Sequence, residues 1–512
     1  MERSVADMKK SPAFCVYGGI NTVTGDFGGE LIMPDYYPEI RKIVTVRASA
    51  IPDSKYIHDN ELETGGTLSF DVLYIGDDQT LSCVPYVTEY SQVTTVPDGV
   101  ISADCINVES VAEGISARPL GPRKISLKAR VKNRISYDKY EPYLPMIAGP
   151  ESSPLDTARR RSMEKLERQA ECIEKKLYQL TGSAKDELKT DGIMKPVMCY
   201  GDILINETRA DSRIVNVKGE IALSIIVQNS DGAYGTYCHS IPFEERVDGE
   251  TVTKNTKAVA AGRLAQISVT LGDDGATLYF DAEYDLDVYT ANAGQITFTE
   301  DIYSREYEFK SSHREIKSQS LLCCSNTSLS LAAEGRRKGQ KAQEDYLVSC
   351  IADAKIEKVT TSKGKATAFG LCSFSAYIAS GGEIITEEFS TPFSAEIPIS
   401  EEKAPSELIF HAKAGASGCN CTIQEQKIHA ECRISVSLAA FELESLFPIW
   451  EACIGDKNTV QSNDCVIKVC FPEKGKRIWD IAKEHKASTL LCEKINKKSR
   501  TDICDESPVI IK

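Results

Sequence analysis

Hydrophobic and polar residues alternate through much of the chain up to residue 447, with the two-residue period of half-buried β-strands. Leu68, Phe70, Val72 and Tyr74 illustrate the pattern within the segment 67–75. Short clusters of Gly, Asn, Asp and Ser close such segments, and turns of this kind are typical of antiparallel pairing rather than of βαβ units. The pattern therefore predicts a mainly β chain built from antiparallel sheets.

The strand pattern is repeated three times. A proline followed by an aromatic residue recurs at a separation of 157 and then 150 residues, as Pro85-Tyr86, Pro242-Phe243 and Pro392-Phe393. About 40 residues after each pair lies an alternating segment centred on an alanine, at Ala129, Ala282 and Ala430. Each repeat has the size of a whole domain, so we expect tandem β-sandwich-like modules rather than a solenoid of short repeats.

The repeat sets the expected boundaries. We predict a first module over 1–145, a second over 155–305, a third over 306–447 and a separate tail domain over 464–512. Residues 145–154, rich in Pro, Gly and Ser, are expected to be a linker, and residues 447–463 a spacer. Residues 157–180 are rich in Arg, Glu, Lys and Leu, and they could form either a helix or the first strand of module two.

The proline and aromatic residues of the repeat are predicted to be structural. A proline at a strand end removes a ladder donor, and the ring beside it can fill the core. We assign this role to Pro34, Pro85, Tyr86, Pro242, Phe243, Pro392 and Phe393. On this hypothesis Phe243→Ala creates a core cavity and costs roughly 3 to 5 kcal/mol.

Charge and cysteine content narrow the function classes. The net charge of −15 argues against general nucleic-acid binding, which needs concentrated Lys and Arg. The first thirty residues lack the pattern of a secretory signal, and the apolar runs are far shorter than the ~20 residues of a membrane helix. The 18 cysteines are scattered, so we expect buried thiols of an intracellular protein rather than disulfides.

Enzyme signatures are also missing from the sequence. It contains no His-Glu-x-x-His helix, no Gly-x-Ser-x-Gly elbow and no phosphate-binding loop. Cys419-Asn420-Cys421 and Cys323-Cys324 lack the paired spacing and nearby His of a zinc site. We therefore expect a non-enzymatic protein with no cofactor and no metal.

The tail has a different pattern. A strand over 466–471 is followed by a helix in which Ile478, Ile481, Ala482 and His485 form one face, and a closing strand is expected over 509–511. On a second helix, the partner face is predicted to be Leu491, Cys492 and Ile495. The tail is thus predicted to be a small α+β domain of βααβ order.

Two segments resemble known domains. Residues 31–43, LIMPDYYPEIRKI, resemble the entry motif of the SPOCS domain of spore envelope proteins of endospore-forming Firmicutes. Two further segments, TGGTLSFDVLYIGDD and KGEIALSIIVQNSDG, are similar to the body of that domain. The tail, FPEKGKRIWDIAKEHKASTLLCEKIN followed by PVIIK, resembles a LysM module.

The order of the domains is similar to that of clostridial spore coat morphogenetic proteins. This resemblance implies a scaffold made in the mother-cell cytoplasm and held at the outer surface of the forespore. The implied partner is the coat basement-layer ATPase, of the stage IV sporulation protein A type. The alternative is a cell-wall protein that binds peptidoglycan or another GlcNAc-containing glycan through its LysM-like domain.

The LysM resemblance also places a candidate binding face. In that fold the loop before the first helix lies beside the loop after the second, which places the following residues on one face: Lys474, Gly475, Lys476, Arg477, Asn496, Lys497 and Lys498. The usual Gly-Asp-Thr-Leu loop is Gly475-Lys476-Arg477-Ile478 here, and its basic edge favours an acidic protein partner. Trp479 either packs in the core or anchors an interface, and reversal of charge at Lys476 and Arg477 is expected to abolish recruitment.

Overall fold

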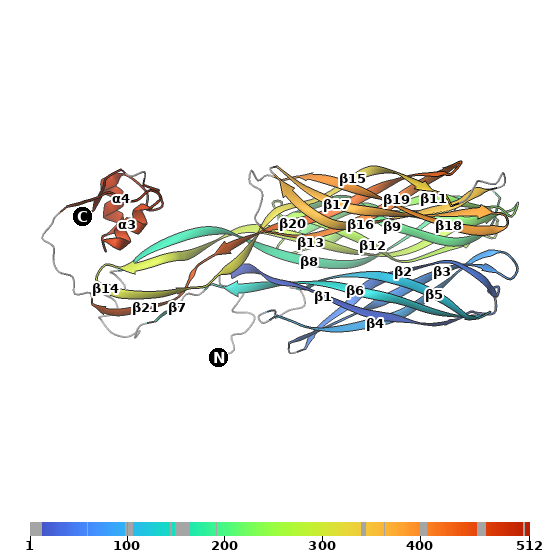
Figure 1. The fold of residues 1–512 in the computed structure, drawn as a ribbon, viewed down its shortest axis with the longest axis horizontal. Coiled ribbons are helices and arrows are strands. Elements are labelled where there is room, and N and C mark those ends of the chain that lie inside the picture. The colour runs from blue at the N-terminus through green and yellow to red at the C-terminus, as the bar shows by residue number, and fades with distance from the viewer. Residues whose placement is uncertain are drawn as a thin grey trace.

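A computed structural model describes residues 13–511 with gaps at 59, 98–99, 101–105, 144–145, 149–162, 191, 339–344, 363, 400–406, 458–466 and 505–506. Almost all of the described chain is strand, and two short helices lie near the C-terminus (Figure 1). The mainly β prediction is therefore confirmed, together with the small α+β tail. None of the helices in the described ranges is long and apolar enough to cross a membrane.

Each module contains six long strands in the same order. Module one comprises β1 (Ala13–Ile32), β2 (Ile40–His58), β3 (Glu61–Gly76), β4 (Leu81–Thr95), β5 (Ile106–Gly121) and β6 (Lys124–Pro142). Module two comprises β8 (Met163–Lys189), β9 (Ile193–Asp211), β10 (Ile214–Asn229), β11 (Tyr234–Asp248), β12 (Lys257–Leu271) and β13 (Thr277–Ser304). Module three comprises β15 (Ile316–Arg336), β16 (Tyr346–Ser362), β17 (Lys365–Ser380), β18 (Glu383–Pro398), β19 (Leu408–Gln424) and β20 (Lys427–Leu446).

In every module the second, third and fourth strands form one antiparallel sheet, and the first, sixth and fifth strands form the facing sheet. The alternating residues seen in the sequence point into the space between the two sheets, where each module has its own apolar core. The first strands of modules one and three also pair, at Val16 and Ser318, so that their facing sheets join into one six-stranded sheet. The three modules lie side by side along their length (Figure 1).

Apolar contacts also join the modules to one another. One buried cluster combines Leu73 of module one, Ile226 of module two and Tyr377 of module three. A second combines Cys15, Ile173 and Phe441, again one residue from each module. Because core side chains are shared in this way, the three modules form one packed body.

We expected the prolines of the repeat at strand ends. The structure places them inside strands. Pro85, Pro242 and Pro392 are exposed residues within β4, β11 and β18. Each of these strands is the edge of its sheet, where the missing N–H of proline can face solvent. An edge position therefore explains the prolines better than a strand end does.

The aromatic residues beside these prolines cover the neighbouring strand. Phe243 is paired with Gly219 and Phe393 with Gly370 across the sheet. A methyl group at Gly219 would lie 2.5 Å from the Phe243 ring, so the glycine makes room for the ring. Phe393 is 5 % exposed, whereas Phe243 is only partly buried, so the two rings are not equal core residues.

The connections complete this comparison, and only the expected linker and spacer differ from the prediction. Pro34 lies in the turn between β1 and β2, where its carbonyl accepts hydrogen bonds from the Tyr37 N–H (3.0 Å) and from Arg123 Nη1 (3.2 Å). The undecided segment 157–180 is strand from Met163 onward, as part of β8. The expected linker and spacer each contain a strand, β7 (Met146–Ala148) and β21 (Ile449–Lys457), while the rest of the linker and residues 458–463 lie outside the described residues.

An arm extends from the body of the modules toward the tail domain. The ends of β8 and β13 continue their pairing beyond the sandwich, from Thr299–Glu167 to Ser304–Met163. Beside them, β14 (Tyr307–His313), β21 and β7 form a three-stranded sheet. Figure 1 shows these strands projecting from one end of the body.

The tail domain lies at the end of the arm (Figure 1). It comprises β22 (Lys468–Cys470), α3 (Ile478–Glu484), α4 (Thr489–Asn496) and β23 (Val509–Ile511), and the two strands pair antiparallel. This is the predicted βααβ order. We refer to residues 467–511 as the terminal domain.

Candidate interaction surface of the terminal domain

Helix α3 is fixed at its start by its own sequence. The carboxylate of Asp480 accepts a hydrogen bond from the backbone N–H of Arg477 at 2.8 Å, which satisfies one donor ahead of the first turn. Ile478, Ile481 and Ala482 are buried, as the helical spacing predicts. The expected face of α3 is therefore correct for its apolar residues.

The expected face of α4 is wrong in two of three residues. Cys492 is buried, but Leu491 is 41 % exposed and Ile495 is 37 % exposed. The inward positions are instead Thr489 and Cys492, one turn apart, since these residues face α3 and the short sheet. Leu491 and Ile495 are one turn apart on the outward side, where they form an apolar strip.

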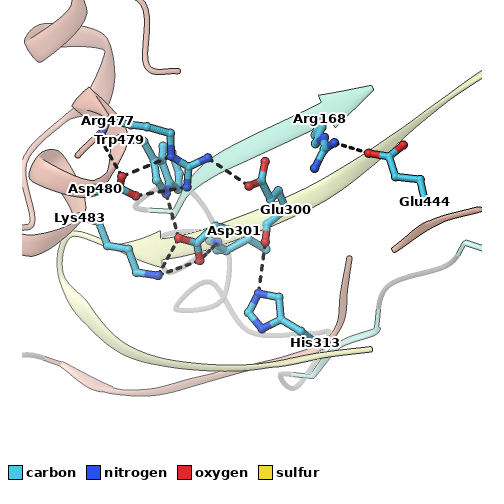
Figure 2. A network of polar contacts seen from close by, with 10 residues as sticks. Arg168, Glu300, Asp301, His313, Glu444, Arg477, Trp479, Asp480 and Lys483 are labelled. Carbon is cyan, nitrogen blue, oxygen red and sulfur yellow. Dashed lines mark hydrogen bonds and ion pairs between the residues drawn. The ribbon is translucent and has the colours of Figure 1, made fainter. Parts of the chain in front are cut away.

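Trp479 connects the terminal domain to the arm. Its side chain is fully buried, and its ring meets the Tyr303 ring of β13 edge-on at a centroid distance of 5.0 Å. The indole Nε1–H donates to Asp301 Oδ2 at 2.9 Å, and Lys483 pairs with the same carboxylate at 2.7 Å (Figure 2). The core alternative for Trp479 is therefore correct, because the indole lies in a core that the domain shares with the arm, and the alternative of an exposed interface anchor is wrong.

Tyr303 completes this attachment from the side of the arm. Its buried hydroxyl donates to the carbonyl of Ala487 at 2.6 Å and lies 2.8 Å from the Thr489 hydroxyl. Burial raises the pKa of Tyr303 above its usual range, so the phenol stays protonated and can donate. Both helices of the domain are therefore held by one side chain of β13.

Arg477 is also used for the attachment. Its guanidinium pairs with Glu300 of β13 at 3.1 Å and with Asp480 at 3.3 Å (Figure 2). Arg500 adds a further contact, since its Nη1 donates to the carbonyl of Lys165 in β8 at 3.2 Å. The positive charge of Arg477 is thus largely neutralised by the arm and by its own helix.

The two loops expected to lie side by side do so. The N–H of Cys504 donates to the carbonyl of Lys476 at 2.9 Å, and the N–H of Trp479 donates to the carbonyl of Arg500 at 3.0 Å. Gly475 adopts a φ of +95° in the first loop, a value that favours glycine. The predicted meeting of the loops therefore has a backbone basis.

The remaining residues of the predicted face differ in what they contact. Asn496 is structural, because its side chain donates to the carbonyl of Ile510 and accepts from the N–H of Ile510, both at 2.8 Å. Lys476 pairs with Glu484 at 2.9 Å, and the hydrogen bond between them raises the pKa of Lys476. The side chain of Lys498 donates to the hydroxyl of Ser507 at 3.3 Å, and its backbone N–H donates to the carbonyl of Glu493 at 3.3 Å.

Lys474 and Lys497 form no ion pair within the described ranges. Large exposed apolar side chains are also concentrated in this domain, which contains seven of the twenty found in the part of the chain that the structure describes. The seven are Ile467, Val469, Phe471, Leu490, Leu491, Ile495 and Ile503. Because the domain is less than a tenth of the chain, this concentration marks it as the leading candidate for an interaction surface.

The body also contains a large cavity, which the sequence did not predict. A cavity of about 1300 Å³ lies between the three modules and is lined by residues of all of them. Asp202 and Lys413 face it, and the pKa of Asp202 is raised to about 6 by burial. Burial likewise lowers the pKa of Lys413, whose Nζ donates to the carbonyl of Gly262. These groups come together only through packing between modules, so no local motif could reveal them.

The described residues contain no group of three or more His, Cys, Asp or Glu side chains arranged to hold a metal ion. Comparison of the chain with family models gives no match. Neither curated proteins nor solved structures match it.

Proposed function

We propose that this protein is a non-enzymatic scaffold or adaptor in the assembly of the spore envelope, where it is recruited to the forespore surface by protein contacts of its terminal domain. The observation that carries the recruitment step is the concentration of exposed apolar side chains on that domain, which also contains Lys474 and Lys497, two lysines with no ion pair among the described residues. The sporulation context rests on the resemblance of the modules to SPOCS domains and of the tail to LysM.

The shape of the molecule suits an adaptor. Modules one and three share a sheet and all three modules share buried clusters, so they present a stiff, elongated surface. The terminal domain lies away from that body, on the arm (Figure 1). One end can therefore contact a recruiting protein while the body stays open to other coat components.

The chemistry of the surface restricts the partner. Leu491 and Ile495 form an apolar strip, and Lys494, Lys497 and Lys498 are close to it in sequence on and after α4. A partner that fits has an apolar patch with acidic residues at its rim. The coat basement-layer ATPase that the resemblance implies, of the stage IV sporulation protein A type, is the partner we propose.

The test uses the full chain, fused to a fluorescent protein in a sporulating cell. Leu491→Ser with Ile495→Ser removes the apolar strip without touching the contacts to the arm. Val87→Ser with Val93→Ser is the matched control, because both valines are exposed on β4 of module one, at 60 % and 55 %. We expect the first pair to lose the ring of fluorescence around the forespore and the control pair to keep it.

A second variant tests the charge. Reversal at Arg477 would also break its pair with Glu300, so Lys474→Glu with Lys497→Glu is the cleaner choice. We expect weaker recruitment with an unchanged melting curve. Normal recruitment of both the apolar and the charge variants would refute the proposed surface.

Binding to purified peptidoglycan distinguishes the rival function. The glycan-binding alternative predicts that the full chain is retained on peptidoglycan at moderate salt, and that Leu491→Ser with Ile495→Ser leaves the retention unchanged. The scaffold proposal predicts no retention. If a strain that lacks this protein formed fully coated, resistant spores, that result would refute the proposed function.

A further inference from the structure

Two buried thiols face each other inside module three. Cys372 lies on β17 and Cys432 on β20, which belong to opposite sheets of the sandwich. Their sulfur atoms are 4.0 Å apart, and the side chains are 0 % and 5 % exposed. Most of the distance between the two sheets is therefore already spanned by the two side chains.

The pair is particular to module three. The position of Cys372 is occupied by Val72 in module one and by Ile221 in module two, as the pairing with the edge strands shows. The position of Cys432, two residues after the repeated alanine, is occupied by Val131 and Tyr284. All of these residues are buried, so the position itself requires only an apolar side chain.

The core around the pair contains several small residues beside larger ones such as Phe374 and Phe393. Buried alanines of the module-three core include Ala366, Ala368, Ala376, Ala395, Ala430 and Ala440. Modules one and two place Phe70 and Tyr284 at comparable depth in their cores. A disulfide between the sheets needs the two cysteines close together, and the 4.0 Å between their sulfur atoms meets that need.

We propose that Cys372 and Cys432 form a disulfide across the sandwich when the protein meets a peroxide. The Cys432 thiol loses its proton, its thiolate attacks one oxygen of hydrogen peroxide, and the O–O bond breaks to give a sulfenic acid and a hydroxide, which takes up that proton and leaves as water. The sulfur of Cys372 then attacks the sulfenic sulfur, the S–O bond breaks, and a second water leaves. Two thiols lose two electrons and two protons, and the peroxide is reduced to two waters.

The order of the two steps follows from the local hydrogen bond. Either thiol could be the donor in the 4.0 Å contact between the two sulfur atoms, and the contact with Cys372 lowers the pKa of Cys432. Cys432 therefore forms the thiolate, and Cys372 becomes the resolving thiol. Peroxide is the fitting oxidant because it is small enough to reach a buried thiol, unlike a bulky disulfide.

A second cluster of cysteines in the same module is a competing site of oxidation. Hydrogen bonds that the Cys350 thiol donates to Cys419 and Cys421, together with burial, raise the pKa of Cys350. Cys419 and Cys421 are partly exposed and lie on one strand, β19. Mapping of the linked peptides shows whether a disulfide forms in this cluster or between Cys372 and Cys432.

In the experiment, the full chain is treated with hydrogen peroxide and then unfolded in the presence of a reagent that blocks the remaining free thiols. Linked peptides are identified by mass spectrometry. We expect one link between the peptides that contain Cys372 and Cys432, with a loss of about 2 Da that a dithiol reductant reverses. Because the link closes a loop of 60 residues, we also expect the thermal midpoint to rise by about 5 °C or more.

Cys372→Val and Cys432→Val are the matched variants, since valine is the residue that module one places at both positions. Each should fold and should lose both the link and the peroxide-dependent rise in midpoint. Free thiols at both positions after oxidation, or a link from either one to Cys350, Cys419 or Cys421, would overturn the proposal. The mapping on the unmodified chain decides the matter even if a variant fails to fold.

Discussion

The body of three modules and the terminal domain are attached to their surroundings in different ways. Modules one and three share a six-stranded sheet, and buried clusters join all three modules, so that the contacts between modules come from several separate places. The terminal domain is held by a few side chains of one strand pair, with Trp479, Tyr303 and Asp301 at the centre. The difference suggests that the body acts as one unit, whereas the terminal domain can be detached by a local change.

The largest effect is expected at the attachment itself. Trp479→Ala removes a fully buried ring and should cost about 3 to 5 kcal/mol, which is comparable to the whole stability of so small a domain. We expect the terminal domain to become sensitive to limited proteolysis while the melting curve of the body is unchanged. Phe471→Ala, at a residue 73 % exposed in the same domain, is the control and should change neither.

The second prediction compares two modules within the body. Phe393 is almost fully buried and Phe243 only partly, so Phe393→Ala should cost about 3 to 5 kcal/mol and Phe243→Ala about 2 kcal/mol. The measurement is chemical denaturation of each variant. Equal costs would mean that exposure is a poor guide to the core of these modules, and would restore the larger value first expected for Phe243.

The third prediction concerns the cavity between the modules and its dependence on pH. Since burial raises the pKa of Asp202 to about 6, the folded protein favours the protonated carboxyl. The contribution to stability is present below the unfolded pKa, near 4, and is lost as the pH rises through about 6. Solvent in the cavity reduces the effect, so we expect a loss on the order of 1 to 2 kcal/mol.

Other charges surround Asp202, so the test is a difference between two proteins. Lys413 opposes the shift, and Asp353 adds to it. Asp202→Asn mimics the protonated side chain, and its stability relative to the unmodified chain should rise between pH 4 and pH 7. A difference that stays constant over this range would show that Asp202 does not titrate in the folded state.

The smallest effect is expected from the ion pair at the attachment. Asp301→Asn keeps an acceptor for the indole N–H but loses the charge that pairs with Lys483, whose side chain is 45 % exposed. We expect a cost of about 0.5 to 1 kcal/mol, visible as faster hydrogen exchange in α3. High salt should produce the same change in the unmodified protein and little further change in the variant.

The alternation and the repeat predicted the β modules correctly, but the arm shows where local patterns fail. In β8 the buried residues Leu166, Ala170 and Ile173 follow one another at helical spacing, among residues that favour helices. Pairing with β13 overrides that preference, and a register shift between Thr299 and Asp301 accompanies it. A long-range partner therefore decided the structure of a segment that its own sequence left open.

The surface of the terminal domain was predicted only in part, and the reason is the same. The motif correctly predicted the places of Gly475 and Asn496 and the contact between the two loops, because these features depend on contacts within the terminal domain. It could not show that Arg477 and Trp479 are engaged with residues about 180 positions earlier in the chain. The sequence pattern also failed to predict that the side chain of Leu491 faces outward. In so short an amphipathic helix, the pattern does not distinguish one face from the next.

The pairing of β1 with β15 has a consequence for synthesis on the ribosome. Module one can form its own sheets early, but the edge of β1 must wait for β15, where Gln319 bonds to Cys15 across 304 residues. At roughly 5 to 20 residues per second, that wait lasts on the order of 15 to 60 s. During this interval the nascent chain presents an unpaired strand edge that a neighbouring nascent chain could capture. Slow translation or crowded polysomes should therefore raise the yield of strand-exchanged aggregates.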